Sequence, residues 1–123
     1  MLETIIRRKW YLQKHLDAPL LKERENYLAF MAEKHSYSHN YLLSLADYLL
    51  LIVTSLKLED GFSEQVPISS IQDAAITWSK TKKNHPMKRK DNSPSSVRKY
   101  MDIAFSWLAY IGRLDGIYTM LLF

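Results

Sequence analysis

The sequence predicts an all-α fold, a compact bundle of four main helices with one additional helix at the N-terminus. The 123 residues include only three glycines and four prolines, which leaves few turns for a many-stranded β fold. An apolar fraction of 47% suits a globular protein, and apolar residues recur three and four positions apart along much of the chain. The length fits a single domain that buries about two-thirds of the surface of its unfolded chain.

The first two helices are expected on either side of residue 17. Residues 2–16 alternate apolar and basic side chains and predict the additional N-terminal helix. Asp17 followed by Pro19 is typical of an N-cap and a first helical turn, so a second helix is expected from there to about His35.

The third expected helix begins at capping candidates in residues 36–38 and runs to about Leu58, with Gly61 closing it. Apolar residues occupy nearly every face of this helix, which indicates that other helices surround it. Its most apolar part, Tyr41 to Leu56, covers 16 residues and contains Asp47. A membrane-spanning helix needs about 20 largely apolar residues, so we expect a core helix and no membrane segment.

The last two helices enclose a polar linker. Ser69 and Gln72 have the spacing of a capping box, which predicts a helix ending near Lys80 or Lys83. Residues 81–92 form the linker, and Ser93 with Pro94 then predicts the start of a final helix that ends at Gly112.

Basic residues concentrate in this linker and in the helix start that follows it. Eight of them stand against Asp91 alone between residues 80 and 99, which gives this segment +7 and leaves −3 for the rest of the +4 chain. Such a density is typical of contacts with a phosphate backbone, and the interleaved Asn and Ser residues can donate hydrogen bonds to phosphate oxygens. The alternative is a solvated loop whose charge keeps the protein soluble. The eight cations are Lys80, Lys82, Lys83, Lys88, Arg89, Lys90, Arg98 and Lys99.

Motifs for chemistry are missing from the sequence. It has no cysteine, glycine-rich phosphate loop or nucleophile elbow, and we expect no catalytic residue, metal or cofactor. His35 and His39 are four residues apart, but no carboxylate completes a ligand set. Asp47 and Asp102 lie within apolar helices, where a buried hydrogen-bonding role or an inter-helix ion pair is expected. The three tryptophans, Trp10, Trp78 and Trp107, are interpreted as core or core-edge residues.

Three segments together resemble the core-binding, SAM-like domain at the N-terminus of tyrosine recombinases and phage integrases, of the transposon-associated type. SYSHNYLLSLADYLLLIVTSL is similar to the first long helix of that domain, PISSIQDAAITWSK to the next helix, and SPSSVRKYMDIAFSWLAYIGRLD to the final one. The segment HLDAPLLKERENYLAFMAEK also looks like the N-terminal portion of the transposon-associated members. The resemblance covers residues 18–115, with residues 1–17 as an N-terminal segment and 116–123 as a truncated junction to an absent catalytic domain.

The resemblance implies a non-catalytic domain that grips duplex DNA at a recombination site, in the cytoplasm of a bacterium and on its nucleoid when bound. Duplex DNA and other recombinase protomers are the implied partners, with no membrane and no small-molecule substrate. No histidine is followed three residues later by arginine, as the catalytic box of the family requires, so the strand-transfer activity is not carried over. The residues it implies at the DNA are Ser36, Ser38, His39, Asn40, Lys82, Lys83, Lys88, Arg89, Lys90, Ser95, Ser96, Arg98 and Lys99.

Two other classes of function remain open from the sequence. One is a small helical protein-interaction or regulatory module whose basic linker meets an acidic partner. The other is a truncated recombinase remnant that folds and has no present role.

Overall fold

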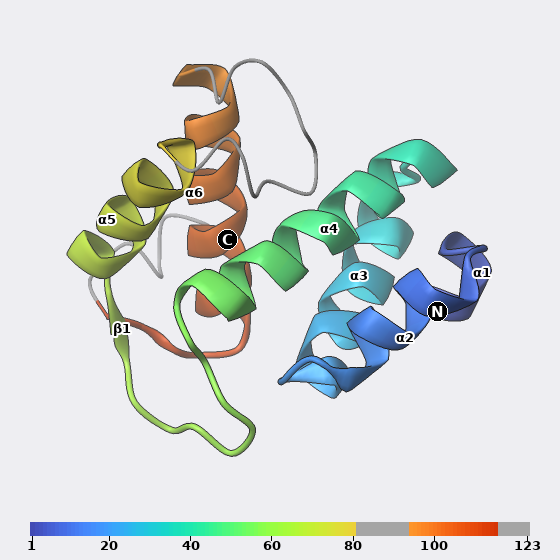
Figure 1. The fold of residues 1–123 in the computed structure, drawn as a ribbon, viewed down its shortest axis with the longest axis horizontal. Coiled ribbons are helices and arrows are strands. Elements are labelled where there is room, and N and C mark those ends of the chain that lie inside the picture. The colour runs from blue at the N-terminus through green and yellow to red at the C-terminus, as the bar shows by residue number, and fades with distance from the viewer. Residues whose placement is uncertain (81–93, 116–123) are drawn as a thin grey trace. The chain divides into compact units, whose positions relative to one another are not determined.

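The computed structural model describes residues 1–80 and 94–115, and most of them are helical (Figure 1). The expected all-α class is confirmed. The chain divides into two compact units, unit 1 over Met1–Phe62 and unit 2 over Ser63–Phe123. Unit 1 contains four helices: α1 (Leu2–Ile5), α2 (Lys9–Asp17), α3 (Leu21–His35) and α4 (His39–Ser55). The described part of unit 2 contains β1 (Val66–Pro67), α5 (Ile68–Ser79), α6 (Pro94–Tyr110) and β2 (Leu114–Asp115).

The segment 2–16 forms two helices, so the expectation of one continuous helix was wrong. Ile6 ends α1 in an extended conformation, with φ −105° and ψ 118°. In a continuous helix Lys9 would follow Leu2 by seven residues and Ile5 by four, on the face that those two buried side chains occupy. Burial of an ammonium group costs far more than one broken helical turn. The break turns Lys9 to solvent.

The junction between α2 and α3 also differs from the prediction. Asp17 does not cap α3; it is the last residue of α2 and accepts a hydrogen bond from Gln13 Nε2 at 2.7 Å. The residue before α3 is Leu20, in the left-handed region at φ 58°, and its N–H donates to Asp60 Oδ1 at 2.7 Å. No side chain caps α3; Asp60, 40 residues away in sequence, instead holds the N–H of the N-cap residue Leu20.

Helix α4 begins as predicted and ends earlier than predicted. Ser38 is the N-cap, and its hydroxyl accepts from the backbone N–H of Tyr41 at 3.2 Å. The helix ends at Ser55, three residues before Leu58, because Lys57 adopts φ 55°. The Leu58 N–H bonds to the Val53 carbonyl at 3.1 Å, which makes this end a Schellman motif. Gly61 also has a positive φ, 75°, but it lies in the following loop and does not end the helix.

In unit 2 the strand pair fixes where α5 begins. β1 and β2 pair in parallel, and the Val66 N–H donates to the Arg113 carbonyl at 2.6 Å. Pro67 is consequently the N-cap of α5, with no side-chain cap, so the capping box predicted from Ser69 and Gln72 was wrong. The predicted C-terminal glycine of α6 is confirmed, since Gly112 has φ 73° and the Arg113 N–H reaches the Leu108 carbonyl at 2.7 Å.

Buried apolar side chains from every described helix except α2 form the cores of the two units, and α2 buries His15. Trp78 and Trp107 are buried as expected, whereas Asp102 is exposed and the expectation of a buried role was wrong. In the described ranges no helix is long and apolar enough to cross a membrane. The predicted Ser93 cap and the linker 81–92 lie outside the described residues.

Candidate nucleic-acid interface

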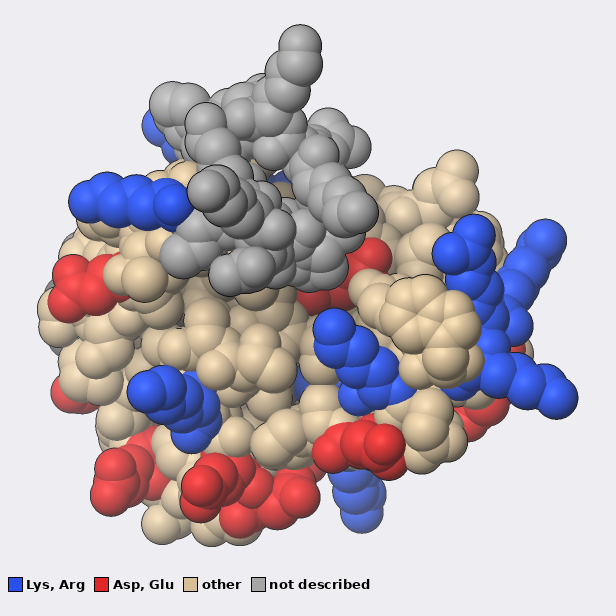
Figure 2. Space-filling model, in the orientation of Figure 1, with Lys and Arg blue, Asp and Glu red and all other residues tan. Residues whose placement is uncertain are grey.

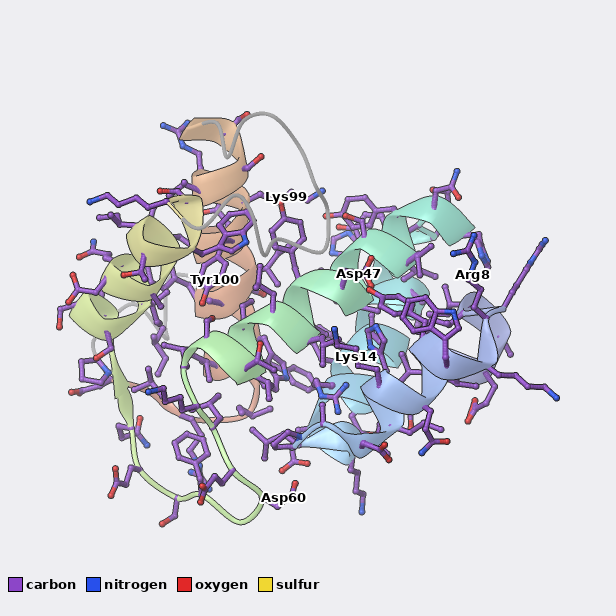
Figure 3. The ribbon with its side chains drawn as sticks, in the orientation of Figure 1. Arg8, Lys14, Asp47, Asp60, Lys99 and Tyr100 are labelled. Carbon is purple, nitrogen blue, oxygen red and sulfur yellow. The ribbon has the colours of Figure 1, made fainter. Side chains whose placement is uncertain are left out.

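One end of unit 2 carries a cation that follows α5 and two consecutive cations near the start of α6. The rings of Trp78 and Tyr100 stack with centroids 5.6 Å apart and an angle of 27° between planes. This contact joins the last turn of α5 to the first turns of α6. Lys80 follows α5 directly, and Arg98 and Lys99 precede Tyr100, so all three backbone positions are near the stacked pair. Figure 3 labels Lys99 and Tyr100 on α6.

The start of α6 adds polar groups at the same end. Ser95 and Arg98 are exposed, and Ser96 and Lys99 are half-buried. The first turn of a helix carries partial positive charge that favours an anion. The remaining predicted cations of this segment lie outside the described residues; they are Lys82, Lys83, Lys88, Arg89 and Lys90.

The other predicted group lies in unit 1, where α3 joins α4. Ser36, Ser38, His39 and Asn40 are all exposed there. Ser36 ends α3 in the left-handed region at φ 51°, which turns the chain sharply toward α4. The hydroxyl of Ser38 is already engaged as a helix cap, so its capacity for a phosphate contact is reduced.

Aromatic rings that the sequence analysis did not single out accompany this junction. The rings of His35 and Tyr37 stack at 4.9 Å, and those of Tyr37 and Tyr41 at 4.1 Å. Partial burial, followed by the interaction with Tyr37, raises the pKa of Tyr41. Three stacked rings therefore lie beside the predicted serine and asparagine groups.

A second basic surface lies on unit 1, and the sequence analysis missed it. Trp10 is 65% exposed, so its interpretation as a core or core-edge residue was wrong. Arg7, Arg8 and Lys9 are exposed at the start of α2, and Lys14 is exposed in its last turn. Figure 2 shows Lys and Arg side chains gathered over α1 and α2 on the visible face of unit 1, and Figure 3 labels Arg8 and Lys14 there. The sequence signal was the run of three cations directly before a tryptophan.

Asp47 joins α4 to α2 through two aromatic side chains, which confirms a hydrogen-bonding role for it. Its Oδ1 accepts from the Tyr11 hydroxyl at 2.5 Å and lies 3.3 Å from His15 Nε2, without the geometry of a hydrogen bond to the imidazole. Burial, and then the bond to Asp47, raise the pKa of Tyr11. The His15 side chain is 0% exposed, so no substrate reaches it and the cluster braces the two helices.

Neither a cluster of metal ligands in the described residues nor a similarity to a known protein points to a function. Within residues 1–80 and 94–115, no three His, Asp or Glu side chains are placed to hold a metal ion. Compared with known proteins, the chain matches no family model, no curated protein and no solved structure. The resemblance to recombinase core-binding domains therefore remains a prediction from the sequence.

Proposed function

We propose that this chain binds duplex DNA through phosphate contacts, as the non-catalytic arm of a tyrosine recombinase or integrase. The observation that carries the proposal is the basic end of unit 2. The Trp78–Tyr100 stack joins the helix ends that carry Lys80, Arg98 and Lys99, next to the helix start that favours anions. The sequence supplies five more cations between these two elements, at residues 82, 83 and 88–90.

Contacts of this kind hold the phosphate backbone and carry no base sequence, so the proposed binding is sequence-tolerant at this surface. The exposed α3–α4 junction is a second candidate contact, with His39 and Asn40 able to donate to phosphate oxygens. Strand transfer is not proposed, because the family's histidine and arginine box is missing from the sequence.

Fluorescence anisotropy with a labelled duplex tests the proposal. If about five to eight phosphates are neutralised, the logarithm of the binding constant falls against the logarithm of salt concentration with a slope of about −4 to −7. The double variant Arg98→Ala/Lys99→Ala should bind more weakly and have a slope less negative by about 2, since each phosphate contact contributes about 0.9.

A charge-matched control is available on α3, where Lys22 and Lys34 are exposed. Lys22→Ala/Lys34→Ala removes the same net charge and should leave the slope unchanged. Absence of binding at low salt, or unchanged binding after Lys88, Arg89 and Lys90 are replaced by alanine, would refute the proposal. Equal affinity for heparin together with a stoichiometric protein complex would favour the protein-interaction module instead.

A further inference from the structure

An exposed tryptophan with three cations before it and one four residues after it distinguishes α2 and the turn before it from the rest of unit 1. We define the basic tryptophan patch as Arg7, Arg8, Lys9, Trp10 and Lys14, all exposed. Trp10 and Ile76 are the exposed large apolar side chains among the described residues. Trp10 is the more exposed of the two, at 65%, although tryptophan is on average a highly buried residue type. A large exposed aromatic ring at such a place is a candidate for ligand contact.

The positive charge of the patch is not neutralised by nearby acids. Within the described residues, the ion pairs include none of the four cations. The nearest acids in sequence have other partners, since Glu3 binds the N-terminal ammonium at 3.0 Å and Asp17 accepts from Gln13. Residues 7–14 contain no acid and therefore carry +4. The charge is available to an external anion.

The backbone adds to this field. Arg8 is the N-cap of α2 in an extended conformation, and no side chain caps the helix start. The N–H groups of the first helical turn point away from the helix body and carry the positive end of its dipole. A phosphate at this end would meet backbone donors and the Arg7 and Arg8 guanidinium groups together.

The composition of the patch selects nucleic acid over a membrane surface. A membrane-surface helix needs a broad apolar face with several large side chains turned outward. Among the described residues of unit 1, the one large apolar side chain that is exposed is Trp10. The opposite face of α2 is not apolar and free either, because His15 on the same helix is buried against the unit. One aromatic ring surrounded by cations is instead the arrangement that stacks on a nucleobase while the cations hold phosphates.

We infer that the basic tryptophan patch binds single-stranded nucleic acid, with Trp10 stacked on a base and the four cations on phosphates. In a duplex each base is stacked between its neighbours, whereas a single strand presents base faces that an indole can cover. This binding is separate from the proposed duplex contact of unit 2, because its residues all lie on α2 and the turn before it. It suits a strand end or an opened stretch of DNA.

Intrinsic fluorescence of the full chain, titrated with oligothymidylate, tests this inference. Of the three tryptophans, Trp78 is 5% exposed and Trp107 is 0% exposed, so quenching by a stacked thymine reports Trp10. Trp10→Ala, followed by anisotropy of a labelled oligothymidylate, should weaken binding about ten- to hundredfold. Trp10→Phe should recover part of the affinity, because its smaller ring still stacks. Circular dichroism confirms that both variants fold.

The controls separate stacking, charge and the duplex proposal. An abasic oligonucleotide of equal length keeps the phosphates and should bind as weakly as Trp10→Ala binds oligothymidylate. Arg98→Ala/Lys99→Ala should leave the quenching of Trp10 fluorescence unchanged. A failure of the proposed duplex binding would therefore not affect this test. Equal affinity of the abasic strand, wild-type affinity of Trp10→Ala, or a fluorescence change with anionic phosphatidylglycerol vesicles but not with oligothymidylate would overturn the inference.

Discussion

Replacement of Arg24 by methionine should destabilise unit 1 by about 3 kcal/mol. Arg24 is 1% exposed, and its guanidinium donates to three backbone carbonyls where α2 ends. The Nε–H bonds to the Pro19 carbonyl at 2.9 Å, and Nη2 bonds to those of His15 and Ala18 at 2.9 and 2.8 Å. Burial lowers the pKa of Arg24.

The magnitude follows from what the three carbonyls lose. Methionine fills the apolar part of the site but donates nothing, and a buried acceptor left without its donor costs about 1–3 kcal/mol. The His15 carbonyl keeps a long bond from the Ala18 N–H, at 3.4 Å, so its loss is at the lower end of that range. Relief of the cost of burying the guanidinium charge offsets part of this loss, which leaves about 1 kcal/mol for each bond. Arg24→Lys retains the charge, but one ammonium group cannot span three carbonyls. It should lose about half as much.

Urea unfolding followed by circular dichroism measures the change, and hydrogen exchange localises it to α2 and α3. The matched control is Lys22→Met, two residues earlier on the same helix and exposed, which should change the free energy of unfolding by less than about 0.5 kcal/mol. If Arg24→Met were as stable as that control, the carbonyls would have other partners and the reasoning would be wrong.

Three further predictions concern two helix ends and stability at alkaline pH. Lys57→Gly should stabilise the protein by about 0.5–1 kcal/mol, because Lys57 has φ 55°, which glycine adopts without strain. Gly112→Ala should destabilise it by about 1 kcal/mol. The added Cβ would meet no neighbour, so the cost comes from the backbone conformation at φ 73°. Thermal unfolding checks both, and a gain from Gly112→Ala would contradict them. Since the folded state raises the pKa of Tyr11, its neutral phenol contributes stability that is present below about pH 10 and lost above it. Urea unfolding at about pH 9 and pH 11 should therefore show a smaller alkaline loss in Tyr11→Phe than in the wild type; equal losses would exclude this role.

Helix positions could be predicted from the sequence where the determining interaction is local. Ser38 caps α4 through a residue three positions away, and Gly112 ends α6 by its own backbone freedom. Two of the failures involve partners distant in sequence. Asp60 holds the Leu20 N–H at the start of α3, and the pairing of Val66 with Leu114 moves the start of α5. Local propensity carries no information about such partners.

The candidate interfaces divide in the same way. A count of charges finds the basic segment of unit 2, because charge density is visible in the sequence without any orientation. The patch on α2 could not be found by counting charges, because Trp10 is assigned to the core by its residue type. The structure shows the helix break at Ile6 and the exposure of the Trp10 side chain. The sequence nevertheless contained a sign of this break, because a helix continuing past Ile6 would have placed Lys9 on the buried face of Leu2 and Ile5.

The two basic surfaces also change what the net charge means for binding. Residues 80–99 carry +7 and residues 7–14 carry +4, so the rest of the chain holds five cations and twelve acids, or −7. A body of that charge repels a polyanion everywhere except at the two basic segments, which limits non-productive encounters. Salt weakens the attraction and the repulsion together. The preference of a polyanion for the basic surfaces over the acidic remainder should therefore be greatest at low ionic strength. Under that condition, the effect of Arg98→Ala/Lys99→Ala on duplex binding and the effect of Trp10→Ala on single-strand binding should be most clearly separated.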